Sequence, residues 1–177
     1  MKAAIIYWSK SGNTEKVALA IKEALEARQA EITYVRVEEA GDLDWFDYDL
    51  VCVGFPSYSW RPPKPVDEFL NQGFGRYRKQ GRVKTGAPVI PDKSALIFVT
   101  YSGPHTGIDE ATPAGDYAAQ FFAHVGFAIL DKLYVVGEFH GSEEHSTLGR
   151  LGDIRGRPTE KDLDQVRNTV NNLLEQN

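Results

Sequence analysis

The sequence predicts an α/β protein built on one parallel five-stranded sheet with helices on both faces. Two observations carry this prediction. Apolar runs of strand length alternate with segments of helical spacing, which favours right-handed crossovers between parallel strands. Several runs are also nearly continuous in branched and aromatic residues, which is typical of strands buried on both faces. The strands are expected at Ala3–Trp8, Glu31–Val37, Leu50–Phe55, Ala95–Tyr101 and Ala128–Val136.

Four helices are expected between and after these strands, the first at Thr14–Arg28. Apolar residues at helical spacing mark them: Val17, Ile21, Ala24 and Leu25; Val66, Phe69 and Leu70; Ala118, Phe121, Phe122 and Val125; Leu163, Val166, Val170, Leu173 and Leu174. The acidic and aromatic stretch Glu38–Asp49 predicts at most a short helix. Gly73–Lys93 and Gly137–Pro158 exceed ordinary loop length, and long loops are usually functional or mobile.

Composition limits the class of protein. The 177 residues with a net charge of −5 predict one globular domain, residues 1–177, and argue against a nucleic-acid binder, which needs a cationic surface. The single cysteine, Cys52, lies in an apolar run, so no disulfide framework forms and an inert, buried thiol is expected. The first apolar run is too short for a signal peptide or a membrane span. We therefore expect a cytoplasmic protein with no membrane partner.

A cluster of short polar side chains follows the first strand. Residues Ser9 to Asn13 form the turn into the first helix, where free backbone N–H groups and the positive end of the helix dipole converge. The side chains of Ser9, Ser11, Asn13 and Thr14 add donors, and Gly12 allows close approach of the backbone. This pattern predicts a phosphate site. The alternative is that these residues only cap the helix.

Two common nucleotide motifs are missing. The sequence contains no G-x-x-x-x-G-K-[ST], and no G-x-G-x-x-G follows the first strand, so a nucleoside triphosphate or a dinucleotide is disfavoured. A phosphomonoester remains the favoured ligand, since sheets of this kind bind ligands at their carboxyl edge.

The segment Ser9-Lys10-Ser11-Gly12-Asn13-Thr14 resembles the [ST]-x-[ST]-G-x-T phosphate loop of the flavodoxins, and the chain is similar to this family over nearly its whole length. The resemblance implies a three-layer flavodoxin-like fold with strand order 2-1-3-4-5. It also implies one non-covalently bound FMN, with its phosphate on this loop.

Two further loops leave the third and fourth strands at the same edge. Both are aromatic, which suits a flat ring beside the phosphate, and in flavodoxin-like proteins these loops enclose the flavin. Trp60 and Tyr58 are candidates for one ring face, Tyr101 or His105 for the other, and Ser102 and Gly103 for backbone donors. The full set expected in these loops is Pro56, Ser57, Tyr58, Ser59, Trp60, Thr100, Tyr101, Ser102, Gly103, His105 and Gly107.

Other signals are weaker. His140 and His145 are five residues apart across Gly and Ser, a spacing that favours a solvated loop over a metal site. The basic segment Arg76 to Lys84 is either a solvated loop or a docking patch for an acidic redox partner. Arg155 and Arg157 could contact a partner, and Thr159 is expected to cap the last helix.

Two functions follow from the resemblance. The favoured one is an electron-transfer protein that shuttles electrons between larger redox proteins, which would dock near the FMN edge or at the basic segment. The alternative is an FMN-dependent NAD(P)H or quinone oxidoreductase of the same fold, because flavodoxins are commonly more acidic than this chain. A receiver-type signalling domain is disfavoured, since the first strand ends without an acidic pair.

Overall fold

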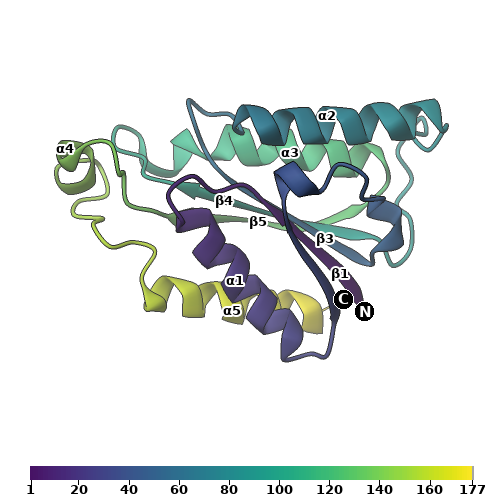
Figure 1. Ribbon diagram of the computed structural model, residues 1–177, viewed down its shortest axis with the longest axis horizontal. Coiled ribbons are helices and arrows are strands. Elements are labelled where there is room, and N and C mark those ends of the chain that lie inside the picture. The colour runs from purple at the N-terminus through teal and green to yellow at the C-terminus, as the bar shows by residue number, and fades with distance from the viewer. Residues whose placement is uncertain (177) are drawn as a thin grey trace.

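The computed structural model describes residues 1–176 and has three layers, with a parallel sheet between two pairs of helices (Figure 1). The strands are β1 (Lys2–Tyr7), β2 (Glu31–Arg36), β3 (Leu50–Pro56), β4 (Ser94–Tyr101) and β5 (Ala128–Val136). They pair in the order β2-β1-β3-β4-β5, and every pairing is parallel. The predicted strands, the parallel sheet and the strand order are confirmed.

Three α-helices and three short 3-10 turns lie between the strands, and two more α-helices follow β5. The helices are α1 (Asn13–Glu26), α2 (Lys64–Lys79), α3 (Thr112–His124), α4 (Glu143–Thr147) and α5 (Glu160–Glu175). The 3-10 turns are η1 (Val37–Glu39), η2 (Trp45–Asp47) and η3 (Gly107–Glu110), so the acidic stretch before β3 forms only short turns, as expected. Helices α1 and α5 cover one face of the sheet, and α2 and α3 cover the other (Figure 1). None of the described helices is long and apolar enough to cross a membrane.

Each face of the sheet has its own hydrophobic core. Ile5, Ile21 and Leu25 belong to the core under α1 and α5, whereas Trp45 and Phe122 belong to the core under α2 and α3. The interior strand β3 is buried from Leu50 to Phe55, as its continuous apolar sequence predicts. Trp8, at the end of β1, packs against the second core, and its ring meets that of Tyr58 edge-on at 6.0 Å.

Both segments that were expected to be long loops contain helix, and one of them, Gly137–Pro158, includes the unpredicted short helix α4. Residues Gly73–Lys93 were expected to form a long loop, but α2 continues through Gly73 to Lys79. A Cβ on Gly73 would lie 2.5 Å from the Trp45 ring, so the glycine allows α2 to pack directly on that indole. Tyr77, one turn later, is fully buried and its hydroxyl accepts a hydrogen bond from the Trp45 backbone. Tertiary packing therefore extends the helix through residues that local propensity disfavours.

The basic segment Arg76 to Lys84 lies at the end of α2 that is remote from the carboxyl ends of the strands (Figure 1). Arg76 donates a hydrogen bond to the Leu43 carbonyl at 2.5 Å, and the Arg82 guanidinium lies 4.3 Å from the Phe46 ring centroid. Two of these arginines therefore form intramolecular contacts at the amino edge of the sheet.

Candidate functional site

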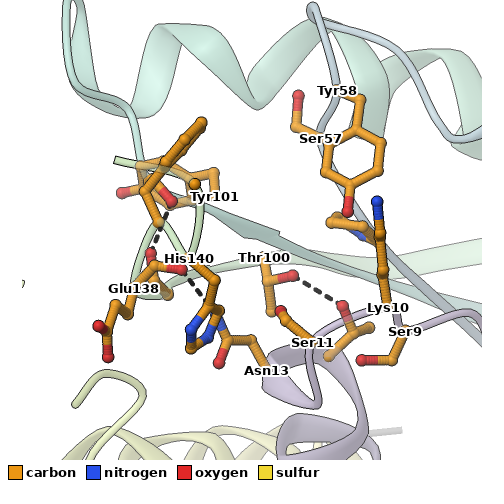
Figure 2. A pocket seen from close by; sticks show the side chains of 16 residues that line it. Ser9, Lys10, Ser11, Asn13, Ser57, Tyr58, Thr100, Tyr101, Glu138 and His140 are labelled. Carbon is orange, nitrogen blue, oxygen red and sulfur yellow. Dashed lines mark hydrogen bonds between the residues drawn. The ribbon is translucent and has the colours of Figure 1, made fainter. Parts of the chain in front are cut away.

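The carboxyl ends of β1, β3, β4 and β5 surround a cavity of about 460 Å³ (Figure 2). Its lining comes from the four loops that leave these strands. The predicted residues in it are Ser9, Lys10, Ser11, Asn13, Thr14, Pro56, Ser57, Tyr58, Thr100, Tyr101 and Ser102, and the segment after β5 adds Gly137, Glu138, Phe139, His140 and Gly141.

The loop from Ser9 to Gly12 is held in a tight turn. The Ser9 hydroxyl oxygen accepts a hydrogen bond from the Gly12 N–H at 3.1 Å, and the Arg36 guanidinium donates to the Ser9 carbonyl at 2.8 Å. Gly12 has a φ of +92°, a left-handed conformation that other residues adopt only with strain. These contacts fix the backbone just before α1 begins.

The same loop presents unused hydrogen-bond donors. Among the described residues, no acceptor contacts the backbone N–H groups of Lys10, Ser11, Asn13, Thr14 and Glu15. Their neighbour Ser9 is almost buried and can donate through its own hydroxyl proton. Free donors at the positive end of a 14-residue helix have the chemistry that binds an anion. This donor set fits a phosphate group.

Two buried threonine hydroxyls lie at the floor of the cavity. Thr14 on α1 and Thr100 on β4 are 1% and 2% exposed, and their Oγ1 atoms are 2.7 Å apart. One hydroxyl donates to the other, so the pair retains one proton that is available to a ligand. Both threonines were predicted site residues, and this contact joins α1 to a strand residue 86 positions away in the sequence.

The segment after β5 forms a further wall of the cavity, with residues that were not among those predicted for the site. Asn13 donates through its amide to the Glu138 carbonyl at 3.0 Å, and Ser102 donates through its hydroxyl to the Gly137 carbonyl at 2.7 Å. His140 also lines this cavity (Figure 2). The available signal was the position of Gly137 directly after a strand at the carboxyl edge.

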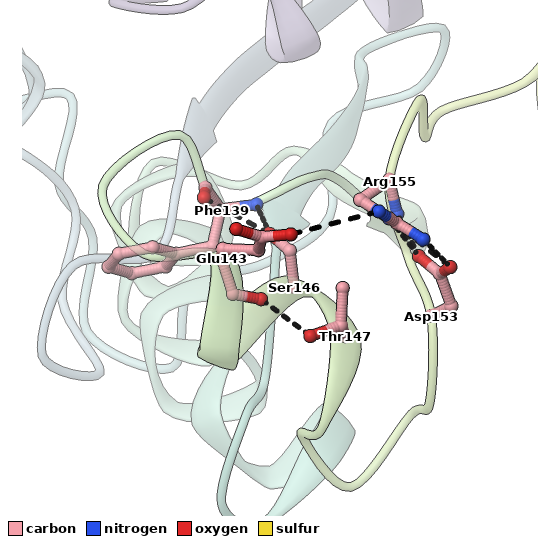
Figure 3. A network of polar contacts seen from close by, with 6 residues as sticks. All are labelled: Phe139, Glu143, Ser146, Thr147, Asp153 and Arg155. Atoms are coloured by element: carbon pink, nitrogen blue, oxygen red, sulfur yellow. Dashed lines mark hydrogen bonds and ion pairs between the residues drawn. The ribbon is translucent and has the colours of Figure 1, made fainter.

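A polar network holds this wall in place (Figure 3). The buried Ser146 hydroxyl on α4 accepts from the Phe139 N–H at 3.0 Å and donates to the Phe139 carbonyl at 3.1 Å. Nearby, hydrogen bonds from Arg155 lower the pKa of Asp153 to about 2, so this carboxylate stays ionised. Arg155 was a candidate for contact with a partner protein. In the structure it forms an ion pair with Asp153 of the same chain.

A second cavity, also of about 460 Å³, continues from the first along the sheet edge and shares Ser57, Tyr58, Tyr101, Ser102 and Phe139 with it. We call it the ring cavity. The other predicted residues in its lining are Ser59, Trp60, Gly103 and His105, and the remainder are Pro104, Glu110 and His145.

Backbone N–H groups, phenols and imidazoles belong to residues that line the ring cavity. The N–H groups of Ser102 and Gly103 have no acceptor within the described chain and are free to donate to a ligand. Burial raises the pKa of Tyr58 and of Tyr101, so both phenols stay neutral. The Nδ1 atom of His145 is buried without a hydrogen-bond partner in the residues described, and its ring lies 5.5 Å from that of His105.

Trp60 lies at the tip of a two-residue hairpin. Tyr58 and Arg61 exchange backbone hydrogen bonds of 2.9 and 3.1 Å, which leaves Ser59 and Trp60 as the turn. Both have positive φ values, +50° and +65°, as a type I′ turn requires. A bulky residue rarely adopts this conformation, and such strain is concentrated at functional sites. The turn leaves the Trp60 side chain 60% exposed at the rim.

Two predicted residues lie outside both linings. Gly12 belongs to the turn before α1, where its N–H donates to the Ser9 hydroxyl and its φ is +92°. Gly107 is buried under the loop after β4, where its N–H donates to the Gly103 carbonyl at 3.0 Å. His140 and His145 line different cavities, and no cluster of three or more potential metal ligands occurs in the part of the chain described.

In comparison with known proteins, sequence similarity covers part of the chain, and structural similarity covers nearly all of it. Residues 4–79 match the family model described as a flavodoxin domain. A flavodoxin from Megasphaera elsdenii is 38% identical over 53 residues, which is 30% of this chain and 39% of that protein. In sequence, the chain therefore matches well under half of this relative.

Solved structures cover the whole chain at lower identity. Oxidised flavodoxin 1 from Bacillus cereus is 16% identical and has a TM-score of 0.69. The match covers 100% of this chain and 99% of that protein. Rubredoxin oxygen:oxidoreductase from Desulfovibrio gigas is also 16% identical, with a TM-score of 0.64, and 99% of this chain matches 35% of it. These likenesses show the flavodoxin-like fold.

Proposed function

Because this chain belongs to the flavodoxin family by the sequence of residues 4–79 and has the flavodoxin-like fold throughout, we propose that it binds one FMN and carries electrons between larger redox proteins. One observation carries the proposal: free backbone donors at the start of α1 open into a cavity that continues into an aromatic one. A phosphate joined to a flat ring system has this distribution of chemical groups.

The residues divide the binding between them. The N–H groups of the loop before α1, with the hydroxyls of Ser9, Ser11 and Thr14, would hold the phosphate. Tyr58, Trp60 and Tyr101 would contact the ring, and the N–H groups of Ser102 and Gly103 would donate to its polar edge. When bound, FMN supplies reversible one- and two-electron chemistry. The chain itself positions the ring and excludes water, so no side chain has to act as an acid or a base.

Docking of a redox partner is proposed at the rim of the ring cavity. Tyr58 and Trp60 are 45% and 60% exposed there, so a partner protein can reach the edge of a bound ring. The basic segment Arg76 to Lys84 is disfavoured as a docking patch, because a partner bound at the amino edge of the sheet would lie far from the ring. We further propose that residues 1–177 act as one domain in a reducing cytoplasm, in keeping with a single, buried cysteine.

The alternative function, an FMN-dependent NAD(P)H or quinone oxidoreductase, is favoured by one observation. A third cavity lies on the far side of Trp60, next to the ring cavity, and has the size of a small-molecule site. A reductase needs a place for a second substrate, whereas an electron carrier does not.

Three measurements test these proposals. The purified chain, freed of any flavin, is titrated with FMN and with riboflavin by flavin fluorescence, and we expect FMN to bind at least tenfold more tightly because only it carries the phosphate. Failure to bind FMN would overturn the cofactor proposal.

Steady-state oxidation of NAD(P)H in the presence of a quinone would favour the reductase. Electron transfer to a protein acceptor without such turnover would favour the carrier.

A further inference from the structure

The cavity on the far side of Trp60 is separate from the two cavities assigned to FMN. Its volume is about 510 Å³, within the range of small-molecule sites, and it lies between the beginnings of α2 and α3. We call it the outer cavity. Trp60 lines both the outer cavity and the ring cavity, so the two cavities adjoin at this residue.

Two exposed aromatic side chains line the outer cavity. Trp60 is 60% exposed and Tyr117, on α3, is 41% exposed, although side chains of this size are usually covered in a folded protein. Tyr117 is nevertheless well fixed, because its hydroxyl donates to Asp67 at 2.5 Å and its ring lies 5.2 Å from that of Phe121. Together with Pro113, these side chains offer apolar surface that suits a flat aromatic ligand.

The charges of the outer cavity favour an anion. Arg61 is exposed, and its guanidinium has no ion pair or hydrogen bond with any other described residue. The Lys64 ammonium has one loose partner, Glu68, at 3.6 Å, and its side chain is 84% exposed. The one carboxylate in the lining, Asp67, already accepts hydrogen bonds from Tyr117 and Asn71.

We propose that the outer cavity binds a flat aromatic molecule that carries one anionic group, with the ring against Trp60 and Tyr117 and the anion on Arg61. A planar guanidinium without a partner is suited to a carboxylate, sulfonate or phosphate, which it can bind through two parallel hydrogen bonds. The proposal concerns binding alone and does not depend on FMN. If FMN occupies the neighbouring cavity, the site would hold a small electron donor or acceptor beside it.

The test uses anthraquinone-2-sulfonate as the probe, with a neutral hydroxymethyl anthraquinone of the same ring size for comparison. Both are titrated into the full chain saturated with FMN, and binding is measured by calorimetry and by quenching of tryptophan fluorescence. Saturation with FMN keeps the probe out of the ring cavity. We expect the sulfonate to bind and the neutral compound to bind roughly tenfold more weakly, because it forms no charge-assisted hydrogen bonds.

Three variants locate the site. Arg61→Gln is expected to weaken sulfonate binding by roughly tenfold and to leave the affinity for the neutral compound unchanged. Tyr117→Leu is expected to weaken both compounds, since it removes an aromatic wall that does not line the FMN cavities. The matched control is Arg78→Gln, which removes an exposed arginine from the other end of α2 and should change neither affinity.

Two results would overturn the proposal: no binding of the sulfonate to the FMN-saturated chain, or equal sulfonate affinity in Arg61→Gln and the unaltered chain. The test is separable from the cofactor proposal. If the chain does not bind FMN, the same titrations on the protein alone still reveal whether Arg61 and Tyr117 determine sulfonate binding.

Discussion

The Asn13 side-chain amide donates a hydrogen bond to the Glu138 carbonyl over 3.0 Å, and this contact joins residues 125 positions apart in the sequence. It ties the loop before α1 to the segment after β5, the two sides of the proposed phosphate cavity. A Cβ on Gly137 would lie only 2.7 Å from the Asn13 amide nitrogen, so the two segments are packed closely.

Loss of the hydrogen bond between Asn13 and Glu138 should make the two sides of the cavity less firmly held together. We expect Asn13→Ala to increase the rate of FMN dissociation by about tenfold, which corresponds to the net value of roughly one hydrogen bond. Stopped-flow fluorescence after dilution of the complex measures this rate. Asn71→Ala is the matched control, since it removes an amide that donates to a backbone carbonyl on α2 at 2.8 Å, away from the phosphate loop. Equal rates in both variants would contradict a role for Asn13.

The buried threonine pair predicts a phosphate-specific effect. Thr14→Val keeps the shape of the side chain but removes the hydroxyl that lies 2.7 Å from that of Thr100. FMN affinity should fall by roughly tenfold to a hundredfold, since hydrogen bonds to charged groups contribute about 1.5–3 kcal/mol, while riboflavin affinity should change much less. The control is Thr33→Val, which removes a β2 hydroxyl that accepts a hydrogen bond from the Tyr48 hydroxyl. Equal losses for the two flavins would show that Thr14 does not face the phosphate.

The left-handed Gly12 predicts that backbone conformation determines binding. A Cβ at Gly12 meets no atom within 4 Å, so Gly12→Ala introduces strain without a clash, of about 1–2 kcal/mol. Gly81 has a φ of +68° and the same open surroundings at the remote end of α2, which makes Gly81→Ala a matched control. Urea unfolding should show similar destabilisation of both variants. Only Gly12→Ala should lose FMN affinity, and an unchanged affinity would contradict the assignment of this loop.

The start of α5 predicts a loss of stability in acid. Burial of Asp162 opposes its ionisation, but hydrogen bonds from Arg157 and Thr159 outweigh burial and lower its pKa below the usual value. A lowered folded-state pKa stabilises the protein above the unfolded pKa of about 4, and this stability is lost as the pH falls through the folded value.

Asp162→Asn should therefore reduce the free energy of unfolding by about 1–2 kcal/mol at neutral pH, and the difference should shrink below about pH 4. Urea unfolding over a pH series measures both effects. Asp164→Asn, an exposed residue of the same helix paired with Arg167, is expected to change stability by less than about 0.5 kcal/mol. A difference for Asp162→Asn that stays constant with pH would contradict the assignment.

The lone cysteine should be chemically silent in the native protein. Burial raises the pKa of the Cys52 thiol far above its ordinary value, so almost no thiolate is present at neutral pH, and only the thiolate is reactive. An aromatic disulfide reagent should release no chromophore from the native chain and one equivalent from the chain in denaturant. Rapid reaction of the native protein would contradict the burial of Cys52.

The sequence predicted what is encoded locally. Each strand is a continuous apolar run, so its position could be read without knowledge of its neighbours, and the phosphate loop is one contiguous segment from Ser9 to Thr14. The helix cap at Thr159 was predicted for the same reason, and the structure shows it as a capping box with Asp162. Site residues contributed by the loops after β3 and β4 could be named because parallel strands end at one edge.

What escaped prediction depends on contacts between distant segments. The length of α2 is determined by Trp45, which packs against Gly73, and a local pattern shows only a glycine in a helix. Glu138, Phe139 and His140 enter the site because Asn13 and Ser146 hold their backbone. The outer cavity exists only because the beginnings of α2 and α3 meet beside Trp60.

The strained turn at Ser59 and Trp60 also bears on how this chain would respond to selection for stability. Type I′ turns favour Asn-Gly, so replacement of Ser59-Trp60 by Asn-Gly should relieve strain and stabilise the hairpin. The same change would delete the indole of the one described residue that lines both the ring cavity and the outer cavity. A library screened for heat resistance alone would thus be expected to discard Trp60, whereas a screen that also requires ligand binding would keep it.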